Sequence, residues 1–347
     1  MPKKKVAVAM SGGVDSSLAA WLLKDAGYEV IGVHLKLWAD PDYEDNIAIL
    51  KQTSSSLNIP FHELNLEAEF QSLVIDYFCQ KYSEGRTPNP CPICNKHIKF
   101  GLLLRRALAM GAGYLATGHY ARVEKALEGY RLLRATDTTK DQSYFLYTLG
   151  QSELPYIMLP LGRRDKVEVK RLAEEKGLTS RPQHESHDIC FIPGSDYRSF
   201  LARHIPVKPG DIVDSSGRIV GKHGGLAYYT VGQRQGLGFS TGERQYVLRL
   251  DIQNNRLVVG SKDQLLSRRL TARKLSWVAG KPPQNLDNIT AKIRYQSKEA
   301  PAKLYLNQRT AIVEFHQPQS AVTPGQTIVF YQDNTVLGGG IIQESLD

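Results

Sequence analysis

Residues 6–17 read VAVAMSGGVDSS, and this stretch decides the fold. The apolar residues 6–10 are typical of a buried strand, and the helical segment at 17–27 ends at a glycine. Paired glycines between a strand and a helix let successive backbone N–H groups converge on one point, where the helix N-terminus adds partial positive charge. The stretch therefore predicts a phosphate-binding loop at the end of a parallel strand.

Short apolar strands and helical segments continue to alternate up to about residue 200. Further strands are expected at 29–38, 60–66 and 114–123, and helices at 44–57, 67–82 and 96–112. This alternation implies right-handed crossovers and a parallel sheet with helices on both faces. The fold class predicted for this part is α/β and Rossmann-like.

The pattern changes after residue 204, where period-2 strands are joined by turn residues. Segments 211–221 and 246–260 are typical of hairpins. Six strand-like runs follow, at 273–278, 289–295, 302–306, 310–316, 326–332 and 335–342, and they predict a small antiparallel barrel. The expected domains are a nucleotide-binding domain at 1–199, a central β-rich domain at 200–268 and a C-terminal β-barrel at 269–347.

Composition restricts the class of protein and its partners. The chain has 347 residues and a net charge of +9, which favours a polyanionic partner, although a merely basic enzyme is an alternative. The four cysteines are too few for a disulfide framework and favour reactive or metal-binding thiols. No apolar run reaches the roughly 18 residues of a membrane span, and the start is too short for a signal peptide. We therefore expect a soluble, cytoplasmic protein with no membrane partner.

The glycine loop differs from a Walker A loop because no lysine follows its glycines. Asp15 would repel a phosphate unless a cation, expected to be Mg²⁺, lies between them. An ordinary strand–helix turn with a serine cap is the structural alternative. The loop resembles that of the PP-loop ATP pyrophosphatases, which cleave ATP to AMP and pyrophosphate in order to adenylate a substrate. The resemblance implies that ATP is bound by Ala9, Met10, Ser11, Gly12, Gly13, Val14, Asp15 and Ser16, with Leu35 near the adenine and Gly118 at a later strand end.

Three cysteines lie in polar segments of the same predicted domain. Cys91 and Cys94 form a CPIC sequence in a proline-rich loop, and Cys190 lies in the segment HESHDICFIPG. Lys96 and Lys99, together with the start of the next helix, are expected to lower the pKa of Cys94. Such a set favours redox or metal chemistry, and three incidental cysteines are the alternative. The fourth cysteine, at position 79 in an apolar run, is expected in the core.

Several long motifs occur in a fixed order along the chain: SGGVDSS, GRTPNP with CNKHIKFG, ATGHYAR, KDQSYFLY, SHDICFI and the segment from GDIVDSSGRIVG to VGQRQGLG. Together with IRY and PGQ near the end, they resemble the tRNA-specific 2-thiouridylases over nearly the whole chain. These bacterial and organellar enzymes replace the C2 oxygen of the wobble uridine of tRNA with sulfur. The resemblance implies that ATP adenylates this oxygen, that Cys190 carries a persulfide, and that Cys94 completes the transfer and leaves a Cys94–Cys190 disulfide.

The resemblance also implies contacts with tRNA. The matching positions are His119, Lys140, Asp141, Gln142, Arg294, Tyr295 and Gln326. Taken alone, KDQ at 140–142 would be a helix cap and RY at 294–295 an ordinary strand pair. His184 and His187 are expected to be loop histidines without a catalytic role.

One position departs from the pattern of the family. The usual loop reads PNPD-x-x-C, with an aspartate that assists catalysis, whereas this chain has Cys91 in its place. Cys91, Cys94 and Cys190 then resemble the three-cysteine set of other tRNA thiolases that hold a [4Fe–4S] cluster, whose open iron would bind sulfide. The sulfur source is accordingly either a persulfide donor or sulfide, and the sequence leaves both alternatives open.

Two other functions remain as alternatives at this stage. A PP-loop ligase that adenylates a free metabolite would need neither paired thiols nor a basic face. A non-catalytic RNA-binding module would have no use for Asp15 and the two matched cysteines. ATP-dependent thiolation of tRNA is the function that the sequence favours, with the target uridine flipped out of the anticodon stack.

Overall fold

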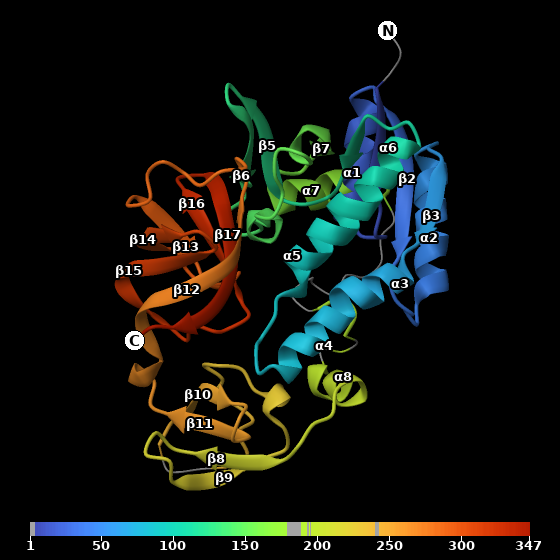
Figure 1. Ribbon diagram of the computed structural model, residues 1–347. Helices are drawn as coiled ribbons and strands as arrows, with labels where there is room; N and C mark the ends of the chain where they lie inside the picture. The colour runs from blue at the N-terminus through green and yellow to red at the C-terminus, as the bar shows by residue number, and fades with distance from the viewer. Residues whose placement is uncertain (1–3, 179–188, 193, 195, 240–242) are drawn as a thin grey trace.

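The computed structural model describes residues 4–178, 189–192, 194, 196–239 and 243–347. His184 and His187 lie outside the described residues. Three parts follow one another around the molecule, with the N-terminal and C-terminal parts side by side and the central part below both (Figure 1). No helix of the described residues has the length and apolar character that a membrane span needs.

The first part is built on a five-stranded parallel sheet in the order β3-β2-β1-β4-β7. Its strands are β1 (Lys5–Ala9), β2 (Glu29–Lys36), β3 (Phe61–Asn65), β4 (Tyr114–Ala116) and β7 (Ile157–Met158). Helices α1 (Val14–Asp25), α2 (Tyr43–Ser56) and α7 (Lys166–Glu175) bury residues in one apolar cluster with Val6 and Val8. Ala7, between those two valines, belongs instead to the cluster on the opposite face. Alternation along β1 therefore buries both faces of the sheet, and the predicted parallel sheet is confirmed.

Two helical stretches run from the sheet toward the other parts of the molecule (Figure 1). The first comprises α3 (Glu67–Phe70), a π-helical segment (Gln71–Ile75) and α4 (Asp76–Ser83). The second comprises α5 (Pro90–Cys94), a π-helical segment (Asn95–Leu103) and α6 (Leu104–Ala109). The expected helix at 96–112 thus begins earlier, at Pro90, because the Asn89 side chain accepts a hydrogen bond from the Cys91 N–H and proline suits a first helical position.

The strand expected at 114–123 is interrupted. β4 ends at Ala116, and β5 (Ala121–Ala126) with β6 (Gly129–Arg134) forms a separate antiparallel hairpin. The break contains Gly118, where a Cβ atom would come within 2.8 Å of the Asp15 carbonyl carbon, so the chain passes too close to the glycine loop for any side chain. Short 3₁₀ turns follow at Ser143–Leu146 and Leu154–Tyr156.

The central part is a small sheet in the order β10-β11-β8-β9. Helix α8 (Tyr197–His204) leads into β8 (Gly210–Val213) and β9 (Ile219–His223), and a 3₁₀ turn (Leu226–Tyr228) precedes β10 (Tyr246–Asp251) and β11 (Arg256–Gly260). Both predicted hairpins are present, and β11 joins them by pairing parallel to β8.

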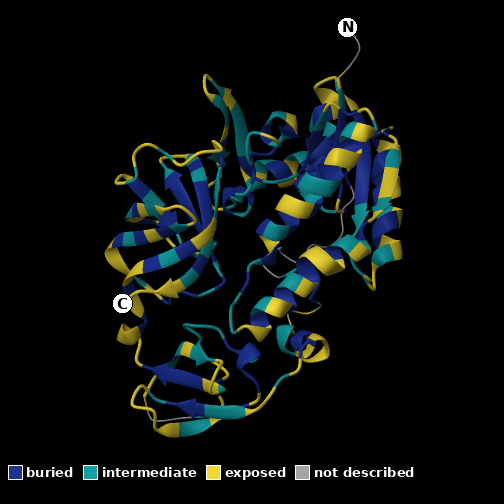
Figure 2. Cartoon of the chain, viewed as in Figure 1, coloured by how far each residue is buried: buried dark blue, intermediate teal, exposed yellow. Residues whose placement is uncertain are grey.

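The last part is a closed antiparallel barrel that follows a 3₁₀ turn at Asp263–Leu265. Its six strands are β12 (Leu266–Trp277), β13 (Ile289–Lys292), β14 (Ala300–Asn307), β15 (Thr310–Ser320), β16 (Thr327–Gln332) and β17 (Thr335–Ser345). Pairing of β12 with β17 closes the barrel, as predicted. Buried and exposed residues alternate along much of its strands (Figure 2), as expected where one face of each strand fills an apolar interior. The β5–β6 hairpin extends this sheet through β17.

Candidate active site

The glycine loop adopts the conformation that its sequence predicts. Gly12 has φ +82°, and Gly13 is the extended residue before α1. The Ser16 hydroxyl donates to the Gly13 carbonyl at 3.0 Å and accepts from the Ser11 N–H at 3.1 Å, while the Ser17 hydroxyl lies 3.2 Å from the same carbonyl. These bonds hold the loop in shape before any ligand arrives.

Asp15 is held by two side chains from distant segments. Lys166, the first residue of α7, places its ammonium 2.6 and 2.7 Å from the two carboxylate oxygens, and the Tyr120 hydroxyl donates to Oδ1 at 2.9 Å. The Lys166 and Asp15 side chains are 16% and 26% exposed. The carboxylate of Asp15 is therefore paired with a cation of the chain itself.

Asn46 of α2 lies on the other side of the glycine loop. Asn46 is only 6% exposed, and its Oδ1 has no hydrogen-bond partner among the described residues. A Cβ atom on Gly12 would lie 2.0 Å from that oxygen. His34 of β2 shares this region, where its Nδ1 lies 2.9 Å from the Met10 carbonyl and burial lowers its pKa. Leu35 follows it on β2 and is half-buried between two apolar clusters.

The cysteine pair lies in a helix and not in the expected loop. Cys94 is buried in the α5 turn against the cluster of α4 and α8, and Cys91 is exposed one turn earlier. Cys190 is exposed and close enough to both to interact with them electrostatically. All of these thiols are free. Cys79, as predicted, is a buried core thiol.

The expected lowering of the pKa of the Cys94 thiol is wrong. Burial raises the pKa of Cys94. Cys91 and Cys190 are exposed at the surface, but the protein packed around them also desolvates their thiols and raises the pKa of Cys91 to about 11 and that of Cys190 to about 12. Lys99 opposes the increase at all three thiols through its positive charge, but desolvation by the surrounding protein is the larger effect. Burial, together with the charge of Lys99, also holds the pKa of His119 well below its usual range, so this imidazole is neutral.

The residues expected to contact tRNA fall into two groups. In the first, Asp141 accepts hydrogen bonds from the N–H groups of Ala135 and Ser143, and Gln142 accepts one from the Tyr120 N–H. Asp141 thus bonds to the first residue of the 3₁₀ turn that follows, while Gln142 at the N-cap position makes no side-chain capping bond. Lys140 beside them is half-buried. His119 follows Gly118 and pairs with the Thr117 hydroxyl at 2.7 Å.

The second group belongs to the barrel. Arg294 and Tyr295 lie in the turn after β13, beyond the strand in which they were expected. The Arg294 guanidinium donates to the Ala321 carbonyl, and Tyr295 packs on Phe145 with ring centroids 4.4 Å apart. Gln326 donates from Nε2 to the Thr87 carbonyl at 3.0 Å.

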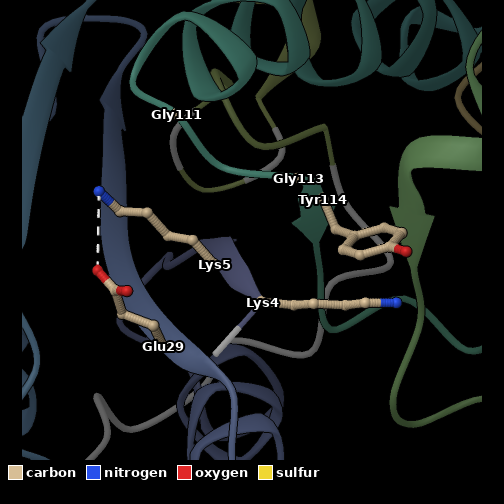
Figure 3. Close-up of a pocket in the computed structure, with 6 residues that line it drawn as sticks. All are labelled: Lys4, Lys5, Glu29, Gly111, Gly113 and Tyr114. Atoms are coloured by element: carbon tan, nitrogen blue, oxygen red, sulfur yellow. Dashed lines mark ion pairs between the residues drawn. The ribbon is translucent and has the colours of Figure 1, made fainter. Parts of the chain in front are cut away.

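None of the expected site residues lines either of two surface pockets. One, of about 570 Å³, is lined by Lys4, Lys5, Glu29, Gly111, Gly113 and Tyr114 (Figure 3). Its residues lie where β1, β2 and β4 begin, whereas nucleotides bind at the carboxyl ends of parallel strands, so it is not the nucleotide site. The other, of about 480 Å³, lies between the central part and the barrel, next to Gly85.

The described residues contain no group of three or more His, Cys, Asp or Glu side chains arranged to hold a metal ion. Iron–sulfur ligands are thiolates, and Cys91, Cys94 and Cys190 are not arranged as such a group. As arranged, these residues do not fit a cluster.

Sequence reasoning missed Lys166, Tyr120 and Asn46. Lys166 follows the helix-capping Asp165 at the start of a charged helix, a setting that gives no sign of a partner at the glycine loop. Tyr120 belongs to the ATGHY motif that supplied Gly118 and His119, so that motif was the signal that could have found it.

Comparison with known protein families matches the chain in three consecutive segments. The models described as tRNA methyl transferase HUP domain, tRNA methyl transferase PRC-barrel domain and Aminomethyltransferase beta-barrel domain match residues 4–194, 198–261 and 267–342. The first of these covers more than half of the chain.

Relatives resemble the chain over its whole length. The tRNA-specific 2-thiouridylase MnmA of Clostridium kluyveri is 44% identical, with 98% of this chain and 99% of the relative covered. That of Moorella thermoacetica is 46% identical, with 97% and 98% covered. A solved structure, the U34-tRNA thiolase NcsA from Methanococcus maripaludis with its [4Fe-4S] cluster, is 19% identical with a TM-score of 0.39, over 58% of this chain and 65% of that one. Sequence identity of 44% and 46% to MnmA enzymes over nearly the full length establishes that this chain belongs to the tRNA-specific 2-thiouridylase family.

Proposed function

We propose that the protein replaces the C2 oxygen of the wobble uridine of tRNA with sulfur, in a reaction driven by ATP. Two thiols next to a lysine in the same domain as a glycine-rich phosphate loop carry this proposal. A ligase acting on a free metabolite would have no use for the thiols. The excess of basic residues and membership of the family support tRNA as the substrate.

The phosphate groups of ATP would bind at the loop formed by residues 9–16, at the carboxyl end of β1. Gly12 and Gly13 allow the backbone to approach the phosphates, and Gly118 keeps the neighbouring strand end free of a side chain. Asp15 is the carboxylate that would hold Mg²⁺, for which the ion would displace the ammonium of Lys166. Lys166 would then be free to neutralise a phosphate oxygen.

Sulfur transfer would proceed in balanced steps. The uridine C2 oxygen attacks the α-phosphate and releases pyrophosphate, and the terminal sulfur of a persulfide on Cys190 then displaces AMP from C2. The Cys94 thiolate attacks Sγ of Cys190, which leaves the thiocarbonyl on the base and a Cys94–Cys190 disulfide. An external thiol reductant must reduce this disulfide before the next turnover.

The neutral state of the resting thiols has a consequence for this sequence of steps. Cys94 must lose a proton before it attacks, and Lys99 is the positive charge that favours its thiolate. Cys91, in place of the aspartate that is usual in the family, would be a protonated thiol and not a carboxylate base at neutral pH.

The test uses the whole protein, purified without oxygen, with unmodified tRNA, Mg·ATP and either a persulfide donor or sulfide. Release of AMP that depends on tRNA, together with 2-thiouridine in the digested RNA, is the expected result. Cys94→Ser and Cys190→Ser should each abolish 2-thiouridine, and Cys79→Ser is the matched control. AMP release without RNA would instead identify a ligase for a small molecule. If the protein instead contains about four irons per chain and thiolates tRNA with sulfide, an iron–sulfur cluster and not a persulfide on Cys190 would deliver the sulfur.

A further inference from the structure

The segment between α4 and α5 is held by the other two parts of the molecule. We call residues 85–89 the barrel-held loop. The Thr87 N–H donates to the Pro324 carbonyl at 2.9 Å, and the Gln326 side chain donates to the Thr87 carbonyl at 3.0 Å. Both backbone hydrogen-bonding groups of Thr87 are therefore satisfied by the barrel, which lies more than two hundred positions away in the sequence.

Side chains on either side reinforce this attachment. The Thr87 hydroxyl lies 3.1 Å from that of Thr230 in the central part, and the Arg86 guanidinium donates to Gln343 of β17 at 2.9 Å. A Cβ atom on Gly325 would lie 2.9 Å from the Thr87 nitrogen, and this glycine has φ +93°. The contact is thus too close for any other residue at position 325.

The barrel side of the contact is itself fixed. Arg294 donates to the Ala321 carbonyl and to the Thr323 hydroxyl, and the Gln326 N–H donates to the Thr323 carbonyl at 3.2 Å. The Gln326 carbonyl in turn accepts from the Ile342 N–H of β17 at 2.8 Å. Residues 321–326 therefore form a hydrogen-bonded support, in which the side chains of Arg294 and Gln326 already have partners.

The other end of the barrel-held loop begins the helix that carries the thiols. Asn89 is two residues beyond Thr87, and its side chain accepts from the Cys91 N–H at 3.2 Å to cap α5. Pro90 fixes the first helical φ angle. Few free torsions therefore separate the bonds at Thr87 from Cys94, and a displacement of Thr87 would be transmitted to that thiol.

We propose that Gln326 is a positioning residue for Cys94: the barrel holds Thr87, and Thr87 fixes the start of α5. The inference rests on the proposed function only in treating Cys94 as the reacting thiol. The barrel is then part of the catalytic assembly, although its side chains need not touch the reacting atoms. Gln326 has this role in the protein without tRNA, whether or not tRNA later contacts it.

The first experiment measures how accessible Cys94 is in the protein without ATP or tRNA. Gln326→Ala is compared with the wild type by timed alkylation with iodoacetamide, followed by peptide mass spectrometry of each cysteine. Loss of one hydrogen bond should raise the labelling rate of Cys94 roughly fivefold. Gln319→Ala is the matched control, because within the part of the chain that the structure describes its side chain donates to the Gln317 carbonyl on the same strand β15.

Cys79, buried in the same domain, is the internal reference. Labelling of Cys94 that does not change, or that increases only in parallel with Cys79, would overturn the proposal. Gln343→Ala, which removes the bond from Arg86, provides a second variant if Gln326→Ala does not fold. It should raise Cys94 labelling in the same selective manner.

The second experiment separates positioning from a direct tRNA contact. In single-turnover thiolation, Gln326→Ala should slow product formation even at saturating tRNA, where a change in the Kd for tRNA no longer affects the rate. Weaker tRNA binding with an unchanged rate at saturation would overturn the proposal. If the wild type makes no 2-thiouridine, the proposed function fails, while the alkylation experiment still decides the positioning role.

Discussion

The ion pair between Lys166 and Asp15 allows a quantitative prediction. Lys166→Met keeps much of the length of the side chain but leaves Asp15 with the Tyr120 hydroxyl and its place in the first turn of α1. An exposed pair contributes up to about 1 kcal/mol, and breaking a buried pair costs about 3–5 kcal/mol. At 16% and 26% exposure this pair lies between the two limits. We therefore expect the ligand-free protein to lose about 2 kcal/mol of unfolding free energy.

Urea unfolding followed by tryptophan fluorescence measures this loss, because Trp21 lies on α1 and reports on the domain concerned. The full cycle comprises Lys166→Met, Asp15→Asn and the double variant. Asp15→Asn removes the carboxylate that would otherwise lose its ion-pair partner. Lys166→Met should therefore lower the free energy of unfolding far less in the Asp15→Asn variant than in the wild type. The expected interaction energy is about 1–2 kcal/mol.

Lys170→Met is the matched control, since this lysine is exposed on the same helix. It should change stability by less than about 0.5 kcal/mol. Equal effects of Lys166→Met and Lys170→Met, or an interaction energy below about 0.5 kcal/mol, would refute the reasoning. The ion pair would then add nothing to the stability of the nucleotide loop.

The remaining predictions concern the glycine loop and the thiols. Gly12→Ala should reduce ATP binding at least about tenfold in equilibrium dialysis, because it adds strain at a positive φ and a clash with Asn46. Cys94→Ser should abolish 2-thiouridine while filter binding shows tRNA affinity nearly unchanged; a large loss of affinity would identify Cys94 as structural. Thiolate absorbance at 240 nm should show Cys91 and Cys190 ionising near pH 11–12, above the usual 9.0. Because their folded pKa values are raised, the stability they contribute is present below about pH 9 and lost as the pH rises through 11–12. Titration below pH 9 would contradict this.

Much of the fold could be predicted because it follows local rules. Alternation of Val6, Ala7 and Val8 between two apolar clusters is the property of a strand covered on both faces, and the glycines after it could only turn the chain into a helix. The six strands of the barrel were equally visible as short runs between turn residues. Such patterns survive because each residue's environment is set by its near neighbours in sequence.

The site was less predictable because its properties arise from distant packing. The sequence placed two lysines near Cys94 and so suggested a reactive thiolate, but Cys94 packs in the cluster of α4 and α8, and burial raises its pKa. Lys166 of α7 forms an ion pair with Asp15, and the sequence around Lys166 does not predict that contact. Gln326 could be identified by resemblance alone, and its bond to Thr87 depends on how two domains meet.

The β5–β6 hairpin has a consequence for how the molecule is made. Its strand β6 lies between β5 and β17 and pairs Leu132 with Val336, so one edge of β6 stays open on the ribosome until almost the entire chain has been synthesised. The first domain can therefore fold early, but its union with the barrel is a late event that closes a very long loop. A chain that stops before β17 would keep its nucleotide loop and its thiols, yet expose an unpaired strand edge to every neighbouring copy. A protein truncated before β17 should thus aggregate and not remain as a smaller, active enzyme.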